Sequence, residues 1–120
     1  MKLMILGNEK ALRAIAPLVG DSDFVHFSEI SGAIDTLSKR EFDVILLDSQ
    51  FPEIEEACCR IKEITPAALL IFGVSGEDSW KRAWALDVDG FVPDKIGKAE
   101  LVARLKAVFR PCTNRGKVTV

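Results

Sequence analysis

A short aliphatic run bounded by two aspartates constrains the fold of this chain more than any other feature. The run is Val44 to Leu47, it lies between Asp43 and Asp48, and Phe51 and Pro52 follow it. A continuous aliphatic segment between turn-forming residues is typical of a strand that is buried on both faces, as in a parallel sheet. Asp48 then stands at the carboxyl end of that strand, where open α/β sheets hold their sites. A carboxylate at this place is either a turn former or a reactive group.

Strand and helix patterns alternate five times along the chain. Short segments rich in Val, Ile, Leu and Phe predict strands over 2–6, 23–27, 42–48, 67–74 and 89–92. Between them, apolar residues spaced by three, four and seven predict amphipathic helices that pack on a sheet. The predicted stripes are Leu12, Ile15 and Val19; Ile30, Ile34 and Leu37; Ile54, Cys58 and Ile61; Trp80, Ala83 and Trp84; and Leu101, Leu105 and Val108. We therefore expect a flavodoxin-like (βα)5 fold, a doubly wound parallel sheet with strand order 2-1-3-4-5.

The length of 120 residues fits one compact domain. We expect this domain over residues 1–110, followed by a linker or disordered tail over 111–120, where no periodicity is found. Pro17 lies inside the first helical stripe and should kink or shorten that helix.

Charge and cysteine content exclude several classes of protein. The net charge of −2 provides no basic field for nucleic acid. No apolar run approaches the roughly 20 residues that a membrane span needs, and residues 1–7 match a first strand better than a signal peptide. Three cysteines without metal-binding spacing indicate small hydrophobic side chains in a reducing compartment. A cytoplasmic protein is expected.

The predicted strand order brings the ends of the first, third and fourth strands together in one crevice. The segment that directly follows the first strand, from Gly7 to Lys10, has a single glycine, and the chain has no Gly-rich phosphate-binding motif. Neither flavin nor nucleotide is therefore expected. The single histidine, His26, is expected in the second strand at the sheet edge, away from the crevice, which disfavours nucleophilic hydrolase chemistry.

Four segments stand in an order and spacing that we can compare with a known family: 2–6, 43–48 with Pro52 four residues on, 67–76 and 88–93. Over roughly residues 2–110 the chain resembles the receiver domains of two-component response regulators. This resemblance implies that Asp48 is the acceptor of a phosphoryl group from a histidine kinase and that the Ser75 hydroxyl bonds a phosphoryl oxygen. It also implies that a lysine after the fifth strand neutralises charge and that Phe91 is a switch aromatic. The switch would act on the face formed by the fourth helix, fifth strand and fifth helix.

The chain departs from the family at the positions that hold Mg²⁺ and the lysine. The family's two acids at the end of the first strand correspond to Gly7 and Asn8, with Glu9 next. Because Mg²⁺ is a hard cation that gives up water reluctantly, a site made of Asn8, Glu9 and Asp48 is expected to be weak. The lysine position holds Asp94, and Lys95 follows one residue later, so only a local irregularity of the loop would bring Lys95 into the crevice.

Each of these residues also has an ordinary structural interpretation. Asp48 would bond its own loop backbone, and Ser75 would begin the fourth helix as its N-cap. Glu9 would be a first-turn acid, and Phe91 a core residue. Trp80 and Trp84 either pack on the sheet or form a patch for a partner.

The resemblance and the departures together predict a degenerate receiver (a pseudo-receiver) in a two-component or phosphorelay pathway. Such a module works through contacts of the fourth-helix, fifth-strand and fifth-helix face with a histidine kinase, another signalling protein or a second copy of itself. The alternative is a working receiver, a phosphoprotein whose only enzymatic activity is self-catalysed transfer to Asp48 with weakly bound Mg²⁺. A third hypothesis is a flavodoxin-like enzyme or cofactor binder, and the lack of a phosphate cradle disfavours it.

Overall fold

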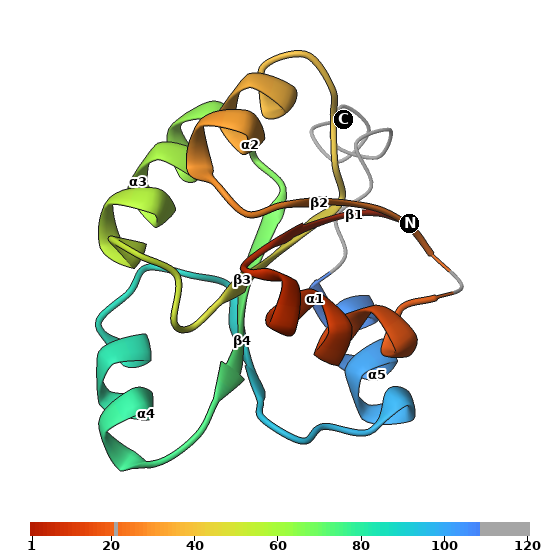
Figure 1. Cartoon of the computed structure of the whole chain (residues 1–120), viewed down its shortest axis with the longest axis vertical. Helices are drawn as coiled ribbons and strands as arrows, with labels where there is room; N and C mark the ends of the chain where they lie inside the picture. Colours follow the sequence, from red (N-terminus) through yellow and green to blue (C-terminus); the bar gives the residue numbers. More distant parts are fainter. Residues whose placement is uncertain (21, 109–120) are drawn as a thin grey trace, which may run out of the picture.

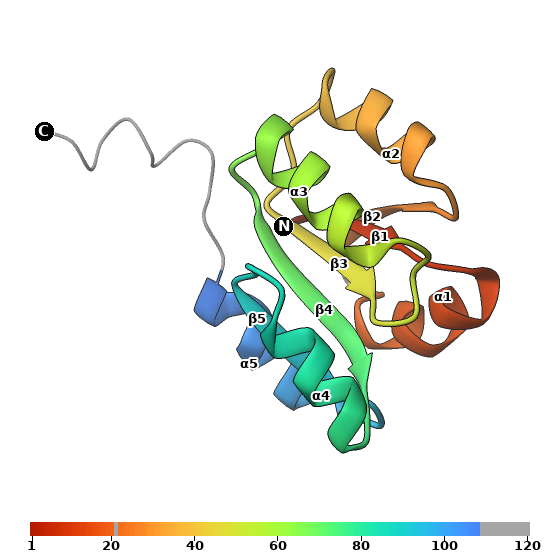
Figure 2. The ribbon, with the colours of Figure 1, turned by 90° about the vertical axis from the view of Figure 1, so that its left-hand side faces the viewer.

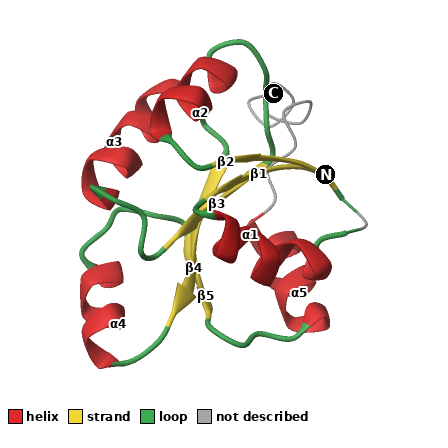
Figure 3. Cartoon of the chain, in the orientation of Figure 1, coloured by secondary structure: helices red, strands yellow, loops and turns green. Residues whose placement is uncertain are grey.

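The chain folds into a parallel sheet covered by helices on both faces (Figure 1, Figure 3). The computed structural model describes residues 1–20 and 22–108. The strands are β1 (Lys2–Leu6), β2 (Asp23–Phe27), β3 (Val44–Asp48), β4 (Ala68–Val74) and β5 (Gly90–Pro93). The helices are α1 (Glu9–Ile15), α2 (Ile30–Leu37), α3 (Ile54–Ile64), α4 (Glu77–Trp84) and α5 (Lys98–Val108), with a 3-10 helix, η1, over Ala16–Leu18.

The sheet has the order β2-β1-β3-β4-β5, and all its neighbouring strands are parallel. The predicted flavodoxin-like fold with strand order 2-1-3-4-5 is therefore confirmed. Helices α2, α3 and α4 cover one face, and α1 and α5 cover the other (Figure 1). The carboxyl ends of β1, β3, β4 and β5 consequently lie at one edge of the sheet.

The predicted aliphatic run is the centre of the core. All four residues from Val44 to Leu47 have no exposed surface, because β3 is flanked by β1 and β4 and covered on both faces. Successive side chains alternate between the two apolar layers, with Ile45 and Leu47 in one and Val44 and Leu46 in the other.

The bounds of three strands differ from the prediction by one or two residues, and an aspartate precedes the observed start of two of them, β3 and β5. Asp43 accepts a hydrogen bond from the Lys2 amide through Oδ2 at 2.8 Å, and β3 begins only at Val44. Asp89 accepts one from the Leu69 amide through Oδ2, also at 2.8 Å, and β5 begins at Gly90. Each carboxylate thus adds a side-chain hydrogen bond to the neighbouring strand just before its own strand begins.

The effect predicted for Pro17 is confirmed. Helix α1 ends at Ile15, and the chain continues as the 3-10 helix η1, which holds Pro17 in its first positions. Val19, the last residue of the predicted stripe, is still buried against the sheet.

One predicted stripe does not lie entirely in the core. In α4, Ala83 is buried and Trp80 is half-buried, but the Trp84 side chain is 72% exposed. A short helix at the side of a sheet turns only a narrow face inward. Trp84 is therefore available at the surface.

Cys58 lies in the core and burial raises the pKa of its thiol to about 11, whereas its neighbour Cys59 is exposed. The hydrophobic interpretation thus holds for Cys58. No helix within residues 1–20 and 22–108 has the length and apolar character needed to cross a membrane. The tail expected over 111–120 lies outside the described residues.

Candidate functional site

A cavity of about 540 Å³ lies at the carboxyl edge of the sheet, between α1 and the loop that follows β5. Its polar lining includes Asn8, Lys10, Asp48, Asp94 and Lys95. The rest of its wall is largely apolar and comes from Ala11, Ala14, Ile15, Leu18, Phe72, Val92, Pro93 and Ile96. The structure therefore brings Asn8, Asp48 and Lys95 to one cavity, whereas Gly7, Glu9 and Ser75 do not line it.

Asp48 is half-buried at the end of β3 and bonds its own loop. Its Oδ1 accepts a hydrogen bond from the Gln50 amide at 3.2 Å, and its backbone carbonyl accepts one from the Phe51 amide at 3.0 Å. Burial raises the pKa of the Asp48 carboxyl, and the Gln50 bond offsets only part of that effect. Within the described part of the chain no lysine or arginine forms an ion pair with Asp48. The turn-forming role of Asp48 is thus present in the structure.

The end of β1 presents no carboxylate to Asp48. A Cβ atom placed on Gly7 would lie 2.9 Å from the Ala11 Cβ and 3.0 Å from the Asp48 Cβ, so only glycine fits there. The Asn8 Oδ1 accepts a hydrogen bond from the Ala11 amide at 2.8 Å and caps α1. Glu9 is exposed and pairs with Arg13 at 3.4 Å, as expected of a first-turn acid, and it does not line the cavity. Across the described ranges, no group of three His, Cys, Asp or Glu residues could hold a metal ion.

Lys95 lines the cavity because the chain turns sharply after β5. The Asp94 amide still pairs with the Val74 carbonyl at 2.8 Å, and Lys95 then adopts a left-handed conformation with φ of 60°. This is the local irregularity that the sequence required for Lys95 to reach the crevice. Asp94 lines the same cavity, so both charges face one region.

Ser75 does not line this cavity, and a bulge in β4 explains its position. Gly73 has a φ of 77°, and the pairing of β4 with β5 shifts register between Phe72 and Val74. Ser75 follows β4 and is exposed, and its role as a phosphoryl ligand remains a prediction. Its alternative role as N-cap is wrong: Gly76 is the N-cap of α4 and receives no side-chain hydrogen bond.

Sequence reasoning missed two residues beside Asp48. The Ser49 hydroxyl donates to the Gly73 carbonyl at 3.0 Å, and a Cβ atom on Gly73 would lie 3.6 Å from both the Ser49 Oγ and the Asp48 Oδ1. A glycine inside an otherwise aliphatic strand often marks a bulge or a close approach, and this signal could have identified Gly73.

His26 lies in the edge strand β2, as expected, but its ring is not remote from the crevice. Its Nε2 is 2.8 Å from the Gly7 carbonyl oxygen, and the Gly7 amide donates to the Phe27 carbonyl at 3.1 Å. The expectation that His26 would lie away from the crevice is therefore wrong, because its side chain reaches across to the end of β1. Two bonds from β2 fix the position of Gly7 next to Asp48.

Phe91 on β5 is half-buried and contacts both Trp80 and Trp84 in an aromatic cluster. Its ring centroid lies 5.8 Å from that of Trp80 and 5.4 Å from that of Trp84, and its carbonyl accepts a hydrogen bond from Arg104 of α5 at 2.8 Å. Figure 3 shows β5 between α4 and α5, and in Figure 2 α4 lies in front of the sheet and α5 behind it. Phe91 thus joins these three elements.

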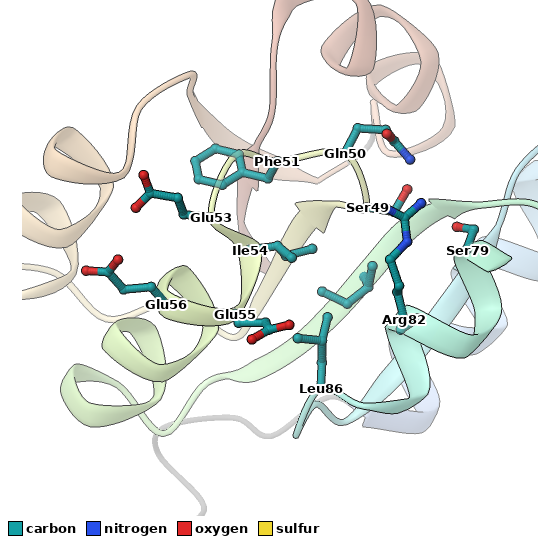
Figure 4. Close-up of a pocket in the computed structure, with 12 residues that line it drawn as sticks. Ser49, Gln50, Phe51, Glu53, Ile54, Glu55, Glu56, Ser79, Arg82 and Leu86 are labelled. Carbon is teal, nitrogen blue, oxygen red and sulfur yellow. The ribbon is translucent and has the colours of Figure 1, made fainter.

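A second cavity of about 510 Å³ lies between α3 and α4, on the other face of the sheet (Figure 4). Glu53, Glu55 and Glu56 line its α3 side, and Arg82 and Ser79 line its α4 side. Asp48, Asn8 and Lys95 do not line it, and it adjoins the candidate site at Gln50, which lines both cavities.

The Gly7 contacts generate a prediction about stability. Gly7→Ala should lower the free energy of unfolding by about 1–3 kcal/mol, because the added methyl group overpacks the contact with Ala11 and Asp48. In urea unfolding, adding Ala11→Gly should recover part of the loss, giving a favourable coupling in a double-mutant cycle. Gly97→Ala is the matched control, because no atom lies within 4 Å of a Cβ there. Equal losses at both glycines would contradict the packing argument.

The raised pKa of Asp48 generates a prediction about pH. The folded state binds the proton more tightly than the unfolded state, so the charged carboxylate lowers stability above the folded pKa, and this cost disappears below the ordinary value of 3.8. Asp48→Asn keeps the acceptor for Gln50 and should be more stable than the natural chain at neutral pH, with the difference shrinking on acidification. Urea unfolding across this pH range measures it. Asp94→Asn, at an exposed position of the same cavity, should change stability by less than about 0.5 kcal/mol.

No protein-family model matches this chain, and no curated protein matches its sequence. Solved structures do match its fold. A two-component response regulator from Clostridium difficile superposes with a TM-score of 0.75 at 17% identity, covering 90% of this chain and 94% of that one. The receiver domain of the sensor histidine kinase PA1611 from Pseudomonas aeruginosa, solved with magnesium coordinated in its active site cleft, gives a TM-score of 0.74 at 10% identity, covering 89% and 95%.

A third structure, the BeF3-activated DrrB receiver domain, gives a TM-score of 0.72 at 19% identity and covers 89% of this chain and 95% of that one. The matches extend over nearly the whole described chain, and at these identities they concern the backbone arrangement rather than the site residues. The chain therefore has the fold of response-regulator receiver domains.

Proposed function

We propose that this chain is a degenerate receiver, a signalling module of a two-component or phosphorelay pathway that works through protein contacts without phosphoryl chemistry. The observation that carries this proposal is the end of β1. Gly7 leaves no room for a side chain beside Asp48, the Asn8 oxygen caps α1, and Glu9 pairs with Arg13 at the surface.

The chemistry of phosphoryl transfer explains why this end matters. Transfer to a carboxylate brings several negative charges together, and a divalent cation normally neutralises them. Mg²⁺ needs several oxygen ligands in near-octahedral geometry. Asp48 is the one carboxylate that a β-strand delivers to the cavity in the described structure, and Asp94 follows on an exposed loop. The PA1611 receiver domain holds magnesium in its cleft, so the fold permits the metal and the residues decide its affinity.

The aromatic cluster supports an output surface on the α4–β5–α5 face. Trp84 is the most exposed large hydrophobic side chain of the described residues, and its ring contacts Phe91 at a tilt of 48°, beside Trp80. Exposed aromatic side chains on a packed base are typical of interface centres. The partner is a histidine kinase, another signalling protein or a second copy of this chain, in the cytoplasm.

A working receiver is the second candidate, and the position of Lys95 favours it. Lys95 and Asp48 line the same cavity, so a cation is available near the acceptor carboxylate. In this case Ser75, Lys95 and Phe91 would have their family roles, with Mg²⁺ held weakly by Asp48, Asn8 and Glu9.

Tryptophan fluorescence separates the two candidates. Trp80 and Trp84 both contact Phe91, so a change of that ring on activation should alter their emission. We expect no saturable change when Mg²⁺ is titrated and beryllofluoride is then added. A saturable change in the natural chain that is absent in Asp48→Ala would show a working receiver and overturn the degenerate assignment.

Trp84 generates a prediction about self-association. Trp84→Ala should weaken the concentration-dependent dimer expected on this face in sedimentation velocity, with little effect on stability because the side chain is exposed. Phe24→Ala is the control, since Phe24 is an exposed aromatic on the opposite edge strand β2. A natural chain that stays monomeric, or an equal loss in both variants, would remove the second copy as a partner.

A further inference from the structure

The Asp48 cavity combines a polar end with a long apolar wall. Its volume of about 540 Å³ is within the range of roughly 300–1,000 Å³ typical of small-molecule sites. Its accessible apolar lining comes from Ala14 of α1 and Leu18 of η1, and from Pro93 and Ile96 at and after the end of β5, whereas Ile15, Phe72 and Val92 lie buried at its base. A phosphoryl group is small and fully polar, so apolar lining residues would not contribute to its binding. The cavity is better suited to a larger molecule with a hydrocarbon part.

The polar end contains a carboxylate without a countercharge. Asp48 is half-buried, and the bond that reaches its side chain comes from the Gln50 amide at Oδ1. Lys10 and Lys95 line the same cavity, yet neither forms an ion pair with Asp48. The half-buried carboxylate thus has one hydrogen bond and no countercharge among the described residues. A cation that enters the cavity would meet a carboxylate that water solvates poorly, where a charge-assisted hydrogen bond is strong.

The neighbouring groups favour an organic cation over a metal ion. A divalent cation needs several oxygen ligands, and within residues 1–20 and 22–108 no suitable group of three ligands exists. The Asn8 oxygen is already used by the Ala11 amide. An ammonium group carries one charge, needs only one carboxylate with a few neutral acceptors, and brings an apolar body for the wall.

We propose that this cavity binds a small organic compound with a primary ammonium group, which pairs with Asp48, and an apolar body, which packs between α1 and the loop that follows β5. The inference deepens the proposed function, because it rests on the absence of the metal-dependent chemistry that would otherwise occupy Asp48. The ligand would then be the input of the module.

Three matched probes test the charge of the head group. 2-Phenylethylamine carries the ammonium, 2-phenylethanol replaces it with a neutral hydroxyl, and phenylacetate replaces it with a carboxylate. In 1H–15N correlation spectra of the full chain, 2-phenylethylamine should shift the amides of Gly7, Gln50 and Gly73 saturably. It should bind at least about tenfold more tightly than 2-phenylethanol, the factor expected for one hydrogen bond to a charged group.

Three variants locate the site. Asp48→Asn keeps the shape and the Gln50 contact but removes the charge, and it should cancel the preference for 2-phenylethylamine. Asp94→Asn, at the exposed acid of the same cavity, should leave binding within about twofold, because exposed charges are screened. Ala14→Phe should block the wall without disturbing the core, since Ala14 lines the cavity from an exposed position.

Several results would overturn the proposal. Tighter binding of phenylacetate would show that Lys10 and Lys95 set the charge preference. Equal binding of the three probes, or unchanged binding by Asp48→Asn or Ala14→Phe, would place the contact elsewhere. Absence of saturable shifts in the natural chain would exclude this class of ligand. The beryllofluoride response is read separately, so a working receiver and a failed ligand proposal give different results.

Discussion

The contact between the end of β1 and the end of β3 determines what this molecule can do. Gly7 and Asp48 are the residues that follow and end two adjacent central strands, and their backbones approach so closely that a Cβ atom on Gly7 would lie 3.0 Å from that of Asp48. Bonds from β2 to Gly7 hold this approach in place. In a sheet whose chemistry lies at the carboxyl edge, such a contact decides how many charged groups can converge. Here it leaves Asp48 as a partly desolvated carboxylate with no acidic neighbour on β1.

The polar side chains near the end of β1 and β3 form local hydrogen bonds with the backbone of their own segments. Asn8 uses its side chain to begin α1, and Asp48 uses one oxygen to hold the Gln50 amide. These are ordinary structural roles of Asn and Asp in turns and caps. They coexist with a cavity whose wall is largely apolar. The same positions therefore support the fold and shape a pocket, although they contribute little to metal binding.

The sequence predicted the strands well and the site less well, for physical reasons. The strand from Val44 to Leu47 was predictable because a fully buried strand must be aliphatic on both faces. The bulge at Gly73 was not predicted, because one glycine in an aliphatic run is its only signal in the sequence and does not fix the register of the strand. The left-handed turn at Lys95 depends on tertiary context, since a lysine has no intrinsic preference for positive φ. The exposure of Trp84 was likewise not predictable, because it depends on how far α4 extends beside the sheet.

Strand β5 links the cavity to the aromatic face. Val92 and Pro93 line the cavity, and Phe91 packs against Trp80 and Trp84. Because side chains alternate along a strand, Val92 and Phe91 point to opposite faces of the sheet, and a shift of the β5 backbone moves both together. Arg104 holds the Phe91 carbonyl from α5, so such a shift also reaches that helix. A ligand that packs against the more exposed Pro93 would thus act on the α4–β5–α5 face through one short strand, without requiring a hydroxyl or a metal ion at the site.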